Sequence, residues 1–313
     1  MNFVRLGNSG LKITELTLGM ALTIGTEITD EKKAQALIDK AWDLGIRSFD
    51  VSNNYGNGEA EKMLGRCLKQ YPRQSFVLIS KGSWPVGEFP YYQGLSRKHI
   101  LWAIDESLKR LDSKYVDVYF AHRYDKDVPM REIAKTFNFI IESGKARYWA
   151  TSEWPLEALQ ELIQVCDDLK LEKPITEQFI YSYAVQKSVI NGVKGFCDKN
   201  QLGTMGFSPF CQGYLTGKYR NGIPNDSRIA KKEQINYSKT QNFYEQNKPR
   251  IDHFLAVCER YDIDCSACAL QWCLRQNILP VFGVSKIEQL VHNVQSLSVV
   301  IPEACWEALE ALS

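Results

Sequence analysis

The stretch Ile46-Arg47-Ser48-Phe49-Asp50 decides the fold class, because it has the pattern of a short buried strand that ends on a carboxylate. The residues just before it, 32–44, are apolar at helical spacing, and Thr29 or Asp30 is placed to cap that helix. A helix followed at once by a buried strand is the repeating unit of α/β proteins. We therefore expect a parallel sheet covered by helices.

The same unit recurs along almost the whole chain. The predicted strands cover residues 15–19, 46–50, 76–80, 116–120, 147–151, 175–179, 204–207 and 279–282. The predicted helices cover residues 32–44, 60–69, 97–111, 130–142, 155–166, 189–199, 248–276 and 287–296. A turn-rich segment at residues 3–12 adds an amino-terminal β-hairpin. Eight strand-then-helix units favour a closed barrel over an open sheet. Residues 1–313 are thus predicted to form one domain, a single (β/α)8 TIM barrel with extra carboxyl-terminal helices.

The charge balance argues against a polyanionic partner. The chain has 38 basic and 37 acidic side chains and a net charge of +1, so nucleic acid is not expected to bind. Residues 1–5 lack an apolar signal core, and no apolar run approaches the ~20 residues of a membrane span. The nine cysteines are an odd number and are spread singly, which is typical of reduced thiols. These observations predict a cytoplasmic protein with no membrane segment.

The cysteines and histidines do not have the spacing of a metal site. Cys265 and Cys268 lie in a predicted amphipathic helix, and no second pair completes a zinc motif. We interpret both as small side chains that face a core. The four histidines are scattered, which disfavours a metal-dependent barrel hydrolase.

Four polar side chains fall at or just after predicted strand ends: Asp50, Tyr55, Lys81 and His122. The carboxyl ends of parallel barrel strands share one face, so these groups are expected to converge there. The pKa of an unperturbed tyrosine is roughly 10, and a nearby ammonium is expected to lower it. Asp50 would hold Lys81 charged, Lys81 would stabilise the tyrosinate of Tyr55, and His122 would position a carbonyl oxygen. The set predicts a proton donor for carbonyl reduction.

Several motifs, in the right order, resemble those of the aldo-keto reductase family over essentially the whole chain. They are Phe49-Asp50-Val51, Tyr55-Gly56, Glu61-x-x-Leu64-Gly65, Ser80-Lys81 and Tyr115-Val116-Asp117-Val118 leading to His122. Other segments resemble the branch of the family that contains the voltage-gated potassium-channel beta subunits. They include Tyr148-Trp149-Ala150-Thr151-Ser152, Ser208-Pro209 and Thr216-Gly217-Lys218-Tyr219.

The resemblance implies a cofactor, NADPH/NADP, bound across the carboxyl face of the barrel without a separate dinucleotide domain. By position, Ser152 and Gln178 match residues that hydrogen-bond the nicotinamide amide, and Phe207 matches an aromatic ring that stacks on it. The positions that match the pyrophosphate and ribose lining are Ser208, Phe210, Gly213, Lys218 and Arg228. Those that match the clamp on the adenosine phosphate are Gly283, Ser285, Lys286, Gln289 and Asn293.

Two functions from different classes follow from this resemblance. The first is an NADP(H)-dependent oxidoreductase that reversibly reduces aldehyde or ketone carbonyls to alcohols, with a small-molecule carbonyl or alcohol as its substrate. The second is an NADPH-binding regulatory or redox-sensing subunit similar to the channel beta subunits. His122 favours the reductase, because the channel subunits carry asparagine at the matching position. We expect the loops at residues 82–95 and 221–247 to set substrate specificity. An oligomer is possible but is not predicted.

Overall fold

Eight parallel strands close into a barrel in the order β10-β3-β4-β5-β6-β7-β8-β9, which confirms the predicted fold class. The computed structural model describes residues 1–220, 222–224, 227, 230 and 237–312, with the backbone alone for 237–241. The barrel strands are β3 (Thr17–Gly19), β4 (Ser48–Asp50), β5 (Val77–Gly82), β6 (Val116–Ala121), β7 (Ala146–Ser152), β8 (Thr176–Ile180), β9 (Gly203–Phe207) and β10 (Leu279–Phe282). The last strand pairs with both β9 and β3, so the sheet has no free edge.

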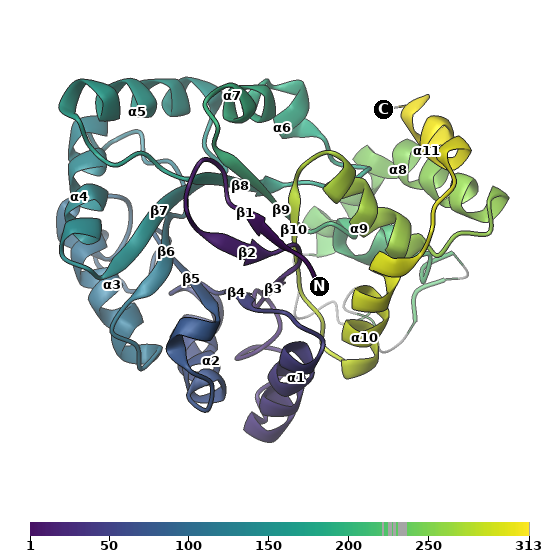
Figure 1. Cartoon of the computed structure of the whole chain (residues 1–313), viewed down its shortest axis with the longest axis horizontal. Helices are drawn as coiled ribbons and strands as arrows, with labels where there is room; N and C mark the ends of the chain where they lie inside the picture. Colours follow the sequence, from purple (N-terminus) through teal and green to yellow (C-terminus); the bar gives the residue numbers. More distant parts are fainter. Residues whose placement is uncertain (221, 225–226, 228–229, 231–236, 313) are drawn as a thin grey trace.

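Helices surround the barrel, and several of the later ones gather beside β9 and β10 (Figure 1). They are α1 (Glu31–Asp43), α2 (Glu59–Leu68), α3 (Arg97–Arg110), α4 (Met130–Glu142), α5 (Leu156–Leu169), α6 (Lys187–Ile190), α7 (Val193–Lys199), α8 (Tyr237–Arg260), α9 (Cys265–Arg275), α10 (Ile287–Gln295) and α11 (Glu303–Glu310). Short 3₁₀ turns are η1 (Tyr55–Gly58), η2 (Arg73–Ser75), η3 (Pro90–Tyr92), η4 (Cys211–Thr216) and η7 (Ser296–Ser298).

Local sequence explains where the helices begin and which face they bury. Of the two cap candidates for α1, Asp30 caps the helix, and its carboxylate accepts a hydrogen bond from the backbone N–H of Lys33 at 3.0 Å. The side chains of α1 that repeat at helical spacing, such as Leu37 and Ile38, are buried against the barrel. Ser96 caps α3 in the same way through the backbone N–H of His99.

The amino-terminal hairpin closes one end of the barrel. Its strands β1 (Phe3–Arg5) and β2 (Lys12–Thr14) pair antiparallel, as predicted. A Cβ added at Gly7 would lie 2.5 Å from the backbone nitrogen of Gly203, at the start of β9, so only glycine permits this close approach. Thr14 also bonds to Ser48 at the start of β4. The hairpin therefore covers the amino ends of the strands and leaves their carboxyl ends for a functional site (Figure 1).

Two predicted helices are each divided in the structure. The expected helix 189–199 breaks into α6 and α7 at Gly192, whose φ of +80° ends the first segment. The expected helix 248–276 breaks into α8 and α9 at Asp262, which has a left-handed φ of +53°, and Asp264 then caps α9. Helix α8 also starts earlier than predicted, at Tyr237, so it takes in the end of the expected loop 221–247.

Candidate active site

Three strand ends converge on one buried carboxylate. The Lys81 ammonium on β5 donates to Asp50 Oδ1 on β4, and it also donates to the carbonyl oxygen of Val51 at 3.2 Å. From β8, Gln178 Nε2 donates to Asp50 Oδ2 at 2.9 Å. The Lys81 side chain is fully buried and that of Asp50 is 4% exposed. Asp50 thus has a partner on each oxygen, which fixes its orientation.

Tyr55 and His122 complete the cluster beside this ion pair. Tyr55 opens η1 in the loop after β4, and His122 follows the last residue of β6. The two rings meet edge to face, with centroids 5.9 Å apart. Lys81 Nζ lies 5.6 Å from the centre of the Tyr55 ring and 5.5 Å from that of Phe120. The structure therefore brings the four predicted catalytic side chains together.

The acidity of Tyr55 differs from the sequence-based expectation. A lowered pKa was expected from the ammonium, but burial raises the pKa of Tyr55 well above its ordinary value. The negative charge of Asp50 adds to this rise, and the positive charge of Arg123 opposes it. Burial also lowers the pKa of Lys81, and the contact with Asp50 counteracts that shift. Because burial and Asp50 both raise its pKa, Tyr55 stays protonated in this state.

His122 is held as a neutral imidazole. Burial lowers its pKa well below the ordinary value, and the nearby charges of Lys81 and Arg123 lower it further. Its Nδ1 lies 3.0 Å from the Ser52 hydroxyl oxygen, which also donates to Asn54 Oδ1 at 2.7 Å. Ser52 therefore orients the ring and influences which nitrogen carries the hydrogen. Ser52 was not among the residues predicted from the sequence, and its only signal there is its place two residues after Asp50.

Arg123 is a second residue that the sequence analysis missed. One guanidinium nitrogen, Nη1, donates to the carbonyl oxygen of His122 at 2.5 Å and to the Ser152 hydroxyl at 3.1 Å. The carbon Cζ lies 5.4 Å from the centre of the Trp84 ring, which in turn meets the His122 ring edge to face. A cation directly after His122 was the available signal in the sequence.

The residues predicted to hold the nicotinamide lie on neighbouring strands. Ser152 ends β7 and pairs in register with Gln178 on β8. Both are buried, and through Arg123 and Asp50 respectively they contact the cluster of the four predicted catalytic side chains. Phe207 ends β9 and packs against apolar side chains inside the barrel.

The predicted pyrophosphate segment has an unusual backbone. Ser208, Cys211 and Gln212 have left-handed φ angles of +63°, +49° and +57°, a conformation that costs free energy for residues with a side chain. Within the same segment, Phe210 packs edge to face on Phe282 of β10. A Cβ added at Gly213 would lie 2.9 Å from Cε of Lys218, so the lysine lies directly over this glycine. A cation next to glycine backbone is a chemical environment that suits a phosphate.

The predicted adenosine-phosphate residues lie where β10 leads into α10. Gly283 lies against the end of β3, with Gly19 O 3.3 Å from a Cβ added at this position. The backbone N–H of Ser285 donates to Gln289 Oε1 at 3.1 Å, Lys286 is the N-cap residue of α10, and Asn293 is buried on that helix. A hydroxyl, an ammonium and a helix start fit an anionic group. Arg228, the remaining predicted contact, lies outside the described residues.

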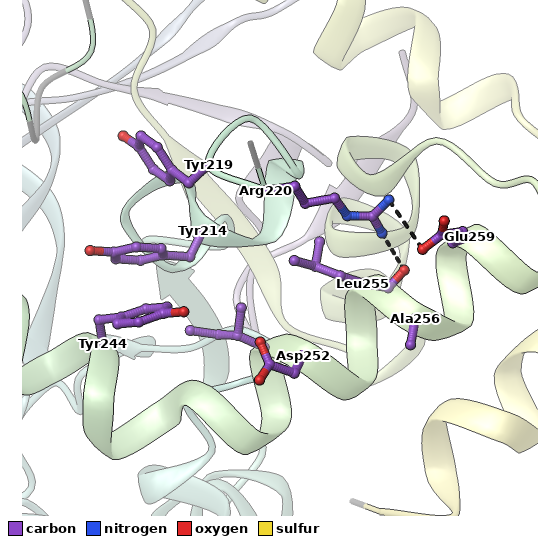
Figure 2. Close-up of a pocket in the computed structure, with 9 residues that line it drawn as sticks. Tyr214, Tyr219, Arg220, Tyr244, Asp252, Leu255, Ala256 and Glu259 are labelled. Atoms are coloured by element: carbon purple, nitrogen blue, oxygen red, sulfur yellow. Dashed lines mark hydrogen bonds and ion pairs between the residues drawn. The ribbon is translucent and has the colours of Figure 1, made fainter. Parts of the chain in front are cut away.

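A pocket of about 300 Å³ lies next to the predicted pyrophosphate segment, between η4 and α8 (Figure 2). Tyr214 lies between Tyr219 and Tyr244 on one side, with ring centroids 5.1 and 4.5 Å away. On the other side, Arg220 bonds to the carbonyl oxygen of Leu255 and lies 3.6 Å from Glu259. The four predicted catalytic residues are not part of this pocket.

Within the described part of the chain, no group of three or more metal-ligating side chains could hold a metal ion. No helix in the same residues is long and apolar enough to cross a membrane.

The fold and this cluster define a class of protein, the parallel (β/α)8 barrels with polar groups at the carboxyl ends of the strands. The sequence profile of the Aldo/keto reductase family matches residues 15–313. The chain belongs to this family, whose members generally bind NAD(P)H.

Individual relatives cover nearly the full chain. The chain is 34% identical over 303 residues to a Schizosaccharomyces pombe protein named as a voltage-gated potassium channel subunit beta, covering 94% of this chain and 88% of that protein. Proteins with the same type of name are 34% identical over 304 residues in Oryza sativa subsp. japonica and 32% identical over 305 residues in Arabidopsis thaliana. In both cases the match covers 96% of this chain and 92% of the relative. The resemblance to the family and to this branch is confirmed.

Proposed function

We propose that this protein reduces aldehyde or ketone carbonyls to alcohols with NADPH, and that Tyr55 donates the proton to the carbonyl oxygen. The observation that carries the proposal is the position of Tyr55 between two groups with suitable chemistry. Lys81 Nζ lies 5.6 Å from the Tyr55 ring centre, and the neutral His122 ring lies 5.9 Å away. An acid needs a group that stabilises its conjugate base and a group that positions its proton acceptor, and these two neighbours supply both.

In this mechanism Tyr55 keeps its proton until negative charge develops on the carbonyl oxygen, because burial and Asp50 raise its pKa. Lys81 then stabilises the phenolate that remains. Asp50, itself held by Gln178, keeps the Lys81 ammonium in place. Little reorganisation is therefore needed when negative charge develops on the Tyr55 oxygen. The reverse reaction, oxidation of an alcohol, uses the same groups in the opposite order.

His122 would donate a hydrogen bond to the carbonyl oxygen and align it with Tyr55. A neutral imidazole has a single N–H, so donation from Nε2 requires that Nδ1 accept from a neighbouring group. The Ser52 hydroxyl lies 3.0 Å from Nδ1 and would supply this bond once its single hydrogen turns from Asn54 Oδ1 to Nδ1. In that orientation Ser52 would select the active tautomer of His122.

The chain offers residues of the right chemistry to hold the cofactor. Ser152 and Gln178 would bind the nicotinamide amide beside Phe207, and Lys218 would bind the pyrophosphate above Gly213. Ser285 and Lys286, at the start of α10, would bind a ribose phosphate, which favours NADPH over NADH. The chemistry that the cofactor supplies when bound is hydride transfer to the carbonyl carbon.

The names of the relatives favour a second candidate function, an NADPH-binding regulatory subunit of a potassium channel that senses redox state. Such a subunit needs the cofactor residues but does not need rapid turnover. His122, in contact with both Tyr55 and Ser52, is more useful to a reductase than to a sensor. We therefore place the reductase first.

The test is NADPH oxidation by the wild-type protein and by Tyr55→Phe, with an activated aromatic aldehyde and a small dicarbonyl as substrates. Removing the acid should lower kcat by about 10²- to 10⁴-fold, while NADPH still binds, as measured by quenching of protein fluorescence. Tyr261→Phe, at the turn after α8, is the matched control and should keep wild-type turnover.

The outcomes separate the two candidates. Turnover that collapses only in the Tyr55 variant supports the reductase. Tight NADPH binding without turnover of either substrate favours the sensor, and absence of nucleotide binding contradicts both.

A further inference from the structure

We propose that Arg123 forms an anion subsite, so that the preferred substrates are carbonyl compounds that also carry a carboxylate, such as oxo acids and semialdehydes. The inference rests on the proposed reductase function and names its substrate class. It comes from the place of Arg123 in the site and from the lack of a direct ion pair between Arg123 and a carboxylate of the described residues.

Arg123 lies beside the group that would hold the substrate carbonyl. Its Nη1 donates to the carbonyl oxygen of His122 at 2.5 Å and to the Ser152 hydroxyl at 3.1 Å, so the guanidinium spans the ends of β6 and β7. Both contacts use the same nitrogen, so among the described residues Nε and Nη2 are left to donate to a ligand. A planar guanidinium with two such nitrogens matches the geometry of a carboxylate.

No carboxylate of the described residues contacts Arg123 directly. Lys81 is paired with Asp50, but Arg123 forms no ion pair with a carboxylate of the described residues. Glu153 is close enough to influence it electrostatically, yet the Glu153 carboxylate accepts a hydrogen bond from the backbone N–H of Ile180 instead. Arg123 is therefore a cation whose nearest anion, Glu153, is held by the backbone, beside a site where Asp50 and Lys81 form an ion pair and His122 is neutral.

The surroundings of Arg123 fit a substrate with a short apolar body. The guanidinium lies over the Trp84 ring, which is 41% exposed and meets the edge of the His122 ring. An indole face bordering both the imidazole and the guanidinium can cover the carbons between a carbonyl and a carboxylate. Arg123 is itself half-buried, so a charge-assisted bond there is screened less than at an open surface.

The test uses two substrates that differ only in charge, 4-carboxybenzaldehyde and its methyl ester, each assayed for kcat/KM with NADPH. Arg123→Lys and Arg123→Gln both lose the fork of the guanidinium, but only the lysine keeps a positive charge. We expect the acid-to-ester ratio of kcat/KM to fall about 10- to 100-fold in Arg123→Gln and less in Arg123→Lys. Glu153→Gln should raise the ratio, because it removes the opposing charge.

Each outcome bears on a different conclusion. If the wild type reduces the ester but Arg123→Gln leaves the ratio unchanged, Arg123 only positions Ser152 and His122, and the anion subsite is wrong while the reductase stands. If the wild type binds NADPH but reduces neither aldehyde nor the corresponding pair succinic semialdehyde and its methyl ester, the reductase proposal fails and the subsite fails with it. A wild-type acid-to-ester ratio that falls with added salt and with Arg123→Gln supports the subsite.

Discussion

The inner and outer faces of the same barrel strands hold two different kinds of buried charge. On β5, Lys81 lies inside and bonds to Asp50, whereas its neighbour Ser80 lies outside and bonds to Glu61 of α2 at 2.6 Å. Glu61 also accepts from Arg110 Nε of α3 at 2.6 Å. The outer pair, Glu61 and Arg110, joins two helices to β5 through Ser80, and each Glu61 carboxylate oxygen has a partner. The inner pair, Lys81 and Asp50, lies beside Tyr55 and His122, whose pKa values are shifted.

The same alternation occurs on β8. Gln178 lies inside and donates to Asp50, whereas Glu177 is fully buried outside and accepts from the backbone N–H of Trp154 at 3.1 Å. Successive strand residues lie on opposite faces of a sheet, so in each dipeptide one residue serves the inner site and the other the outer packing. The comparison teaches that burial of a charge does not by itself identify a catalytic group. The inner groups converge on Tyr55 and His122, and the outer ones do not.

The largest effect is expected from breaking the inner pair. Lys81→Met should lower kcat for carbonyl reduction by about 10²- to 10⁴-fold, because the phenolate of Tyr55 loses its counter-charge. Steady-state NADPH oxidation measures the loss. Ser80→Ala, one residue away on the outer face, is the matched control, and a comparable loss of kcat in that variant would contradict the assignment of roles.

Breaking the outer pair should instead lower stability. Arg110→Met leaves the buried Glu61 carboxylate without its cation, so we expect the free energy of unfolding to fall by about 3 kcal/mol. Urea unfolding followed by circular dichroism measures this change. Below the unfolding transition, kcat should stay within about threefold of wild type, since Arg110 lies outside the site. A loss of kcat with unchanged stability would show that the outer pair acts on catalysis.

A smaller effect is expected from the group that orients His122. Ser52→Ala removes the partner of His122 Nδ1, and we expect kcat/KM to fall about 10-fold, the value of one hydrogen bond to a catalytic group. Ser52→Thr keeps a hydroxyl and should recover part of the activity. Equal activity of the alanine and threonine variants would exclude the role of Ser52 in selecting the tautomer.

The last prediction concerns Glu177 and the pH dependence of stability, with no change in catalysis expected. Burial raises the pKa of Glu177 to about 8, so the folded protein holds a proton that the unfolded chain loses at lower pH. This contribution to stability is fully present below the ordinary glutamate pKa and is lost as pH rises through about 8, with a slope on the order of 1 kcal/mol per pH unit. Glu177→Gln should flatten the dependence of the melting temperature on pH between about pH 5 and pH 8. A variant with the same slope as wild type would show that another group causes it.

Much of the fold was predictable from local patterns, and the errors have local causes. Alternating helix and strand patterns predicted the eight barrel strands, because each strand is short, apolar and followed by an amphipathic helix. The breaks at Gly192 and Asp262 were missed, since apolar spacing continues across them while a left-handed backbone interrupts the helix.

The sequence by itself determined which polar groups stand at the carboxyl ends of the strands. Asp50, Lys81 and His122 had to share that end, because parallel strands in one barrel point the same way. Only the tertiary structure decided that Ser52 contacts His122, that Arg123 joins His122 to Ser152, and that Tyr55 is harder rather than easier to ionise. Those properties depend on loop paths and on the exclusion of water by the whole barrel, which no single segment specifies.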